Sequence, residues 1–389
     1  MADAFENILG QPEVRDFLRK SVVRESVTHA YLFTGPTGSN KTLAAFSLAQ
    51  ALLCPKGPHG PRGGNCGSCD ACGRVGRRRH PDVRFYAPAG ANGYLIEQIR
   101  EIMADTALAP IQAERKVYIL DAVESLGTAA ANAFLKTLEE PPEGVVLILL
   151  GRTRASVLPT IVSRCQVVPF RHIPVSEAAG IVRQNTGASL EQAAMAIAAC
   201  GGSITGSIEF LRSPGNERLA FRSEVLSIME RLAAADAWDV VGYARRLLEL
   251  SKAPLDEMRA LQEAELAENA DFLARSALRQ VEARHKRQLT AKTREGLMQT
   301  TAIMASWLRD TLMVRAGTPE LVVNRDAREA IGRVAAAADE ARLAAALAAV
   351  RRCNQAIAYN VSPETCLDAL LFEMKEVLDG SGHSDKPCL

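Results

Sequence analysis

Short aliphatic runs alternate with longer helical stretches over roughly the first 170 residues of the chain. Each run is bounded by glycine, proline or a helix-start signal, which is typical of a mostly parallel sheet with crossover helices. The five runs span residues 31–33, 82–85, 116–120, 145–150 and 166–170. We therefore predict an α/β domain over residues 1–170 that uses these runs as strands.

The pattern changes in two steps after this domain. Residues 171–213 have the character of short helices around a double glycine at 201–202, and we expect a small helical lid. From about residue 214 glycine and proline become sparse, which predicts an all-α collar domain over residues 214–389. One helix face there repeats near the 3.6-residue spacing of a buried stripe, with Leu297, Met304, Leu308 and Leu312.

Composition and charge narrow the function classes. The net charge is only +1, so the chain lacks the basic excess of a protein that holds DNA alone. The longest aliphatic run, residues 145–150, is far shorter than the roughly 20 residues of a membrane helix. The acidic start MADAFENILG has no basic region followed by an apolar stretch. We expect a cytoplasmic protein with no membrane partner.

A phosphate-binding loop is indicated by Gly35-Pro-Thr-Gly38-Ser-Asn40-Lys41-Thr42, which follows an apolar run and precedes a helical stretch. Backbone N–H groups at the helix start would cradle phosphates, Lys41 would reach the β/γ-phosphates, and Thr42 would bind Mg²⁺. Asn40 replaces the usual second glycine. Asparagine tolerates positive φ, but we expect its side chain to enter space where backbone should approach phosphate. ATP or ADP with Mg²⁺ is a possible cofactor.

An acidic motif follows the third run, where Asp121 ends an apolar strand and could hold Mg²⁺ through water. ATPases of this type normally place a water-polarising glutamate next, but this chain has Ala122. Losing that group should cost orders of magnitude in hydrolysis rate. Glu124 would share the face of Ala122 if the strand continued, yet it would be displaced by two residues and is a poor substitute.

Four cysteines cluster at the spacing C-x11-C-x2-C-x2-C: Cys54, Cys66, Cys69 and Cys72. Four thiolates suit one closed, tetrahedral structural zinc site, so we predict a zinc module at 54–72 inserted in the α/β domain. The metal would also hold the Gly/Pro-rich loop 56–64 in place. An iron–sulfur cluster is the alternative, and His59 or His80 could replace a cysteine.

Several segments together resemble the AAA+ subunits of the bacterial DNA polymerase III clamp loader. The opening Phe5-x-x-Ile8-x-Gly10-Gln11 is similar to the family's N-terminal box, which lies near the adenine. The other segments are HAYLFTGP from His29, NAFLKTLEEPP from Asn132, LPTIVSRCQ from Leu158 and NVSPETCLDALLFEM from Asn360. The resemblance implies an α/β P-loop AAA+ domain with a small helical lid, followed by the all-α collar that oligomerises.

The same resemblance assigns roles to single residues. It implies that Arg164 is an arginine finger acting in trans, because a planar, always-charged donor stabilises charge on a transferring phosphoryl group. Thr153 would serve as sensor 1, whereas residues 202–207 lack the sensor-2 arginine of active subunits. Clamp-loader subunits also carry a small zinc module after the first helix. The pattern resembles the non-hydrolysing type of subunit more than the hydrolysing gamma/tau subunit.

The implied function is to supply Arg164 to a neighbouring ATPase subunit and to help load the sliding clamp onto primed DNA, as part of the DNA polymerase III holoenzyme. Implied partners are the gamma/tau and delta subunits, the sliding clamp, and primer–template DNA through the assembly. Two alternatives stay open. One is an active gamma/tau-type ATPase, and the other is a zinc-containing nucleic-acid-binding regulator that uses Arg77, Arg78 and Arg79.

Overall fold

The computed structural model describes residues 4–57, 65–88, 93–212, 217–252, 275–358 and 361–379, with a few positions between 255 and 266. Most of the predicted Gly/Pro-rich loop, His59, Asn360 and the last ten residues lie outside the described part. The chain divides into two compact units. The first unit is Met1–Asn185 with Gly202–Thr205, and the second is Thr186–Gly201 with Gly206–Leu389.

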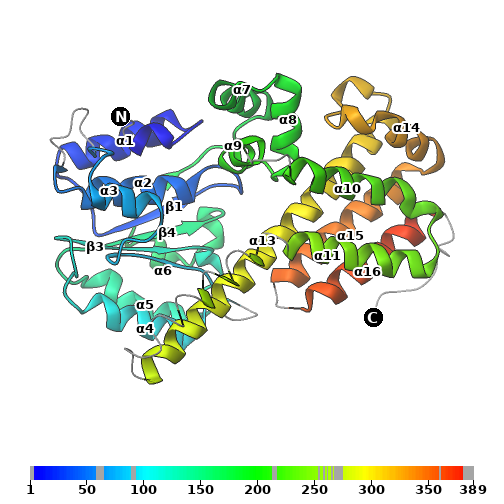
Figure 1. The fold of residues 1–389 in the computed structure, drawn as a ribbon. Coiled ribbons are helices and arrows are strands. Elements are labelled where there is room, and N and C mark those ends of the chain that lie inside the picture. The colour runs from blue at the N-terminus through cyan, green and yellow to red at the C-terminus, as the bar shows by residue number, and fades with distance from the viewer. Residues whose placement is uncertain are drawn as a thin grey trace. The chain divides into compact units, whose positions relative to one another are not determined.

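The first unit contains a five-stranded sheet (Figure 1). Its strands are β1 (Ala30–Thr34), β2 (Val83–Tyr86), β3 (Lys116–Leu120), β4 (Val145–Gly151) and β5 (Gln166–Pro169). All neighbours pair in parallel, in the order β2-β3-β4-β1-β5. Every residue of β1, β3 and β4 is buried, because helices cover both faces of a parallel sheet. The predicted α/β class and its strands are confirmed.

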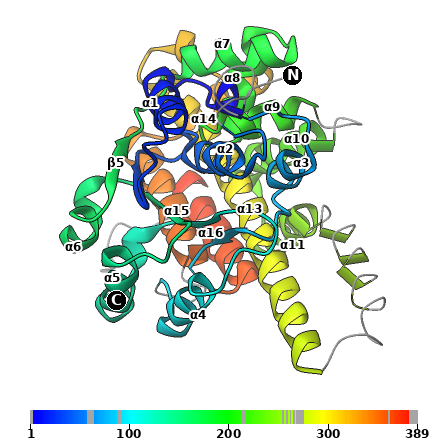
Figure 2. The same cartoon turned by 90° about the vertical axis from the view of Figure 1, so that its left-hand side faces the viewer.

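Two apolar layers form because successive side chains of a strand point to opposite faces. In β1, Tyr31 and Phe33 join one core, whereas Ala30 and Leu32 join the other. Figures 1 and 2 both show α1, α2 and α3 separated from α4 and α5 by the sheet. These helices and the remaining helices of the unit are α1 (Pro12–Val23), α2 (Lys41–Leu53), α3 (Asp70–Gly76), α4 (Ile96–Thr106), α5 (Thr128–Glu139), α6 (Pro159–Val162) and α7 (Val175–Thr186).

The second unit is helical, as predicted for the C-terminal part of the chain. Its helices are α8 (Leu190–Ala199), most of α9 (Ile204–Arg212), α10 (Glu217–Arg231), α11 (Ala237–Lys252), α13 (Arg275–Arg315), α14 (Arg328–Ala337), α15 (Glu340–Ala358) and α16 (Pro363–Asp379). Trp307 and the predicted stripe residues Leu297, Met304 and Leu308 are fully buried in its core. Because α7 groups with the sheet and α8 with the helical unit, a separate lid at 171–213 and the three-domain division stay predictions.

No single described helix is long and apolar enough to cross a membrane. The pair α8 and α9 passes this test together by length and composition, but the two helices are bent by 114° at the break between them. Ala196 of α8 and Phe210 of α9 belong to the core of the second unit.

A buried polar network fixes one loop of the second unit. The carboxylate of Asp310, in α13, is fully buried and accepts hydrogen bonds from the backbone amides of Val323 (2.9 Å) and Asn324 (2.7 Å). The Asn324 side-chain amide donates to the same oxygen at 2.8 Å. Arg222, from α10, donates to the Asn324 side-chain oxygen at 2.7 Å. The loop is therefore held to α13 through the Asp310 carboxylate and to α10 through the Arg222 guanidinium.

Substituting Asp310 by alanine is expected to lower the free energy of unfolding by about 3–5 kcal/mol, because several buried donors lose a charged acceptor together. Urea denaturation followed by circular dichroism measures this loss. Glu320→Ala removes an exposed carboxylate near the same loop and should change stability by less than about 0.5 kcal/mol. Equal stability of the two variants would contradict the assigned role of the network.

Candidate functional site

The phosphate loop connects β1 to α2 in the first unit. Gly38 has φ +82°, and a Cβ atom on it would lie 2.6 Å from the carbonyl oxygen of Gly202, so only glycine fits there. Asn40 directly precedes α2 and has φ 67° and ψ 21°, in the left-handed region. Asparagine is one of the few residues that adopts this conformation readily. The loop therefore keeps a turn that leads directly into the helix despite the missing second glycine.

The side chain of Asn40 contacts the N-terminal segment. Its Nδ2 amide donates to the carbonyl oxygen of Leu9 at 2.9 Å, and the residue is buried. The expectation that this side chain enters the phosphate space stays a prediction. A buried amide needs a hydrogen-bond partner, and the carbonyl of Leu9 supplies one.

Lys41 folds back onto the phosphate loop. Its ammonium donates to the carbonyl oxygens of Gly35 and Pro36, the latter at 2.8 Å, and lies 3.4 Å from the Ser39 hydroxyl. Burial lowers the pKa of Lys41, and nearby Asp121 opposes this shift. Thr42 lies beside it in the first turn of α2. A nucleotide at this site would have to replace the contacts between Lys41 and the loop carbonyls.

The acidic motif departs from the expected extended strand. β3 ends at Leu120, and Ala122 has φ 48°, which turns the chain into a 3₁₀ helix at Val123–Ser125. Burial raises the pKa of Asp121, and Glu124 adds to the shift. Glu124 therefore does not continue the strand, and its carboxylate lies near enough to influence both Asp121 and Lys41 electrostatically.

Glu124 is paired with a residue that sequence reasoning did not single out. Its Oε1 atom lies 3.3 Å from Nε of Arg152, which follows β4 directly. Its Oε2 atom is buried and has no hydrogen-bond partner among the described residues. Thr153, the predicted sensor residue, caps a 3₁₀ helix by accepting from the Ser156 amide at 3.1 Å. Its sensor role stays a prediction.

Gln11 joins three segments around the loop. Its Nε2 atom donates to the carbonyl oxygens of Arg171 (2.8 Å) and Ser39 (3.3 Å). Its Oε1 atom accepts from the Arg171 amide at 3.2 Å. One buried side chain thus connects the N-terminal segment, the phosphate loop and the chain after β5, which explains a glutamine at this position of the N-terminal box.

Arg164 lies just after α6 and is partly exposed. Its Nη1 atom donates to the Thr160 carbonyl oxygen at 2.9 Å and lies 3.3 Å from the Ser163 hydroxyl. Its Nη2 atom forms an ion pair with Glu139, the last residue of α5. Sequence reasoning missed Glu139 as a partner, because no local spacing links positions 25 residues apart.

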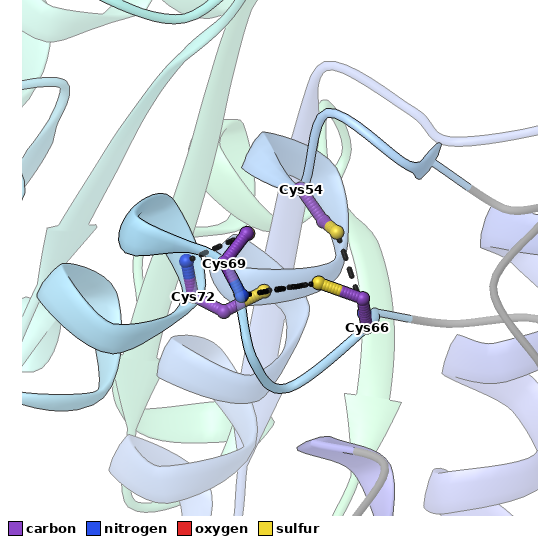
Figure 3. A group of neighbouring side chains, drawn as sticks. All are labelled: Cys54, Cys66, Cys69 and Cys72. Carbon is purple, nitrogen blue, oxygen red and sulfur yellow. Dashed lines mark hydrogen bonds between the residues drawn. The ribbon is translucent and has the colours of Figure 1, made fainter. Parts of the chain in front are cut away.

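The four predicted cysteines come together in the first unit (Figure 3). Their sulfur atoms all lie within 4.8 Å of one another, and Sγ of Cys66 and Sγ of Cys72 are 3.9 Å apart. A tetrahedral zinc site with bonds of about 2.3 Å would place its sulfurs about 3.8 Å apart. The donor set and the spacing therefore fit one metal ion. Cys54 follows α2 directly, and Cys69 caps α3.

Hydrogen bonds within the cluster favour one thiolate. The Ser68 backbone amide, with help from that of Cys69, lowers the pKa of the Cys66 thiol to about 5. Burial raises the pKa of Cys72 and of Cys69, so a cation would be needed to hold all the sulfurs as thiolates. His80, the alternative ligand, accepts from the Asp82 amide at 3.1 Å and is not in the group of four.

Two family models match the chain. The model described as DNA polymerase III, delta subunit, matches residues 10–174, and the model for the C terminal of that subunit matches residues 273–376. These segments cover the sheet with its phosphate loop and most of the helices from α13 to α16.

Curated relatives carry related names. DNA polymerase III subunit tau of Bacillus subtilis is 32% identical over 238 residues, which cover 60% of this chain and 41% of the relative. Subunit delta' of the same organism is 30% identical over 161 residues, or 41% of this chain and 47% of that protein. Subunit tau of Escherichia coli is 37% identical over 174 residues, or 44% of this chain and 26% of the relative. The matches span less than half the length of these relatives.

Among solved structures, a gamma subunit-related protein of DNA polymerase III from Thermotoga maritima aligns over 93% of this chain and 98% of that chain. Its sequence identity is 20% and the TM-score is 0.43. The family models, the relatives and the parallel five-stranded P-loop sheet lead to one conclusion. This chain belongs to the clamp-loader AAA+ subunits of DNA polymerase III.

Proposed function

We propose that this chain is the delta-prime type of clamp-loader subunit, which does not hydrolyse ATP itself and supplies Arg164 to the ATP site of a neighbouring subunit. The observation that carries this proposal is the acidic motif. Ala122 follows Asp121, and the next carboxylate, Glu124, is turned onto a 3₁₀ helix and paired with Arg152. The residue after Asp121 therefore has no carboxylate with which to position the attacking water.

Arg164 has the properties that an arginine finger needs. It follows a short helix at the surface of the first unit, its side chain is 34% exposed, and its guanidinium is always charged. A charge supplied in this way would stabilise the transferring phosphoryl group of a neighbour's ATP. The proposed partners are the gamma/tau and delta subunits and, through the assembly, the sliding clamp and primer–template DNA. A net charge of +1 agrees with DNA being held by the whole assembly.

The nucleotide site of this chain would bind nucleotide without hydrolysing it. ATP or ADP with Mg²⁺ would contact Gly35, Gly38, Asn40, Lys41 and Thr42 of the phosphate loop, with Asp121 and Thr153 near the phosphates. The cysteine cluster would hold one structural zinc ion, with all four positions filled by protein and none open for chemistry. We keep the predicted division into a P-loop domain (1–170), a lid (171–213) and an oligomerising collar (214–389) as part of the proposal.

The isolated chain is expected to hydrolyse ATP no faster than its Lys41→Ala variant, because a missing water-activating group alone costs about 10²–10⁴-fold in rate. A phosphate-release assay on both purified proteins measures this. Turnover by the wild-type chain that collapses in Lys41→Ala would instead favour an active gamma/tau-type subunit. Nucleotide affinity, measured by calorimetry on the same samples, reports separately whether the phosphate loop binds.

A further inference from the structure

Glu139 holds the guanidinium of Arg164 across two helices of the first unit. Glu139 ends α5, and Arg164 lies two residues after the end of α6. The ion pair joins the Nη2 atom to Oε1 of the carboxylate. We infer that Glu139 is a positioning residue that sets the direction in which Arg164 is presented to the neighbour's ATP. This inference rests on the proposed function of Arg164.

The contacts of Arg164 restrain its side chain and still leave a donor for a phosphate. The Nη1 atom is directed at the Thr160 carbonyl oxygen and the Ser163 hydroxyl, and the Nη2 atom at Glu139. A guanidinium carries five N–H donors in a fixed plane. Within the described residues no contact uses the Nε donor, and the Nη2 atom has a second proton. The Nε donor is therefore left for a phosphate oxygen while Glu139 stays bound.

Holding this side chain matters because a free arginine side chain samples many rotamers, and a contact that restricts them reduces the entropy lost on binding. Helix α6 is only four residues long, and both Thr160 and Ser163 belong to the same short segment as Arg164. Glu139 is different, because α5 is a twelve-residue helix anchored in the core by Phe134 and Leu138. An acceptor on a separate, well-packed helix defines a direction that the local acceptors cannot define.

The carboxylate does not cancel the charge that the finger would deliver. Glu139 is 48% exposed and Arg164 is 34% exposed, so water and salt screen the pair. Exposed ion pairs of this kind are weak in water. A doubly charged phosphoryl group in a closed subunit interface attracts the guanidinium more strongly, because water is excluded there. In the free subunit Glu139 therefore restrains the geometry of Arg164 at little electrostatic cost.

The test uses the clamp loader assembled with its ATPase partners. Glu139→Gln keeps the shape of the side chain and removes its charge, and we expect kcat to fall by about three- to tenfold with the KM for ATP unchanged. Glu140→Gln, which alters the adjacent exposed carboxylate, should keep the wild-type kcat. In an Arg164→Ala background, Glu139→Gln should cause no further loss, because the residue acts through Arg164.

The outcomes separate this inference from the proposed function. A wild-type kcat for Glu139→Gln beside a strongly reduced kcat for Arg164→Ala would overturn the positioning role and leave the finger intact. A wild-type kcat for Arg164→Ala would instead refute the finger itself. A further loss when Glu139→Gln is added to Arg164→Ala would also overturn the inference, since the effect would then come from α5. Unchanged melting temperatures of the variants show that each remains folded.

Discussion

Replacing Arg164 by alanine is expected to slow ATP hydrolysis by about 10³-fold or more at the neighbouring site that this residue faces. The physical reason is that phosphoryl transfer depends on positioned charge, and an arginine supplied from the adjacent subunit completes it. Under the proposed function Arg164 acts on another subunit's nucleotide, because Ala122 takes the place of a water-activating glutamate after Asp121 in this chain.

The measurement is single-turnover ATP hydrolysis by the assembled loader with clamp and primed DNA. Sites that Arg164 does not face should keep their rate, so the loss appears as a missing share of the total hydrolysis. Arg164→Lys should be nearly as slow as Arg164→Ala, because lysine keeps the charge and loses the planar pair of donors. Arg183→Ala, which removes an exposed arginine of α7, is the matched control. Full hydrolysis by Arg164→Ala would end the finger hypothesis.

Substituting Cys72 by serine is expected to remove metal binding and to destabilise the first unit. Cys72 is the most deeply buried of the four cysteines, and its sulfur lies 3.9 Å from that of Cys66. Zinc binding contributes about 10–16 kcal/mol in small structural zinc sites. Loss of one of four ligands should therefore exceed the roughly 0.5–3 kcal/mol of an ordinary substitution.

Elemental analysis should find about one zinc per wild-type chain and almost none in Cys72→Ser. The melting temperature of the wild-type protein should fall in the presence of a strong chelator, and that of the variant should be insensitive to it. Cys165→Ser is the control, because Cys165 lies outside the cluster and burial raises its pKa to about 12. Iron in place of zinc would support the iron–sulfur alternative, and a metal-free wild-type chain would contradict the site altogether.

Local patterns in the sequence were enough to predict the strands, the helical second half and the cysteine cluster. A strand in a parallel sheet is apolar on both faces, so residues 116–120 and 145–150 stand out without any knowledge of their partners. The spacing C-x2-C-x2-C keeps three of the thiols within a few residues of one another, and the fourth follows α2 directly. The phosphate loop likewise depends on a short run between one strand and one helix.

Contacts between distant segments were decided only by the tertiary structure. Asn40 donates a hydrogen bond to the Leu9 carbonyl. Asp310 accepts hydrogen bonds from backbone amides thirteen and fourteen residues away along the chain. Glu139 pairs with Arg164, which is 25 residues away. Side chains of this kind have several acceptable partners in the chain, and packing selects one of them. The position of Glu124 was likewise not predictable from local sequence. Ala122 adopts a left-handed conformation after the strand, and the carboxylate of Glu124 pairs with Arg152.

The sequence by itself determined the class of fold and the types of chemical group at the site, because periodicity, turn residues and ligand spacing are local properties. The tertiary structure decided how those groups are directed. The pair between Arg164 and Glu139 forms because the ends of two helices lie close together. Lys41 contacts its own loop because the Pro36 carbonyl is within reach of its ammonium. These are long-range consequences of packing two cores against one sheet, and no short segment of the chain encodes them alone.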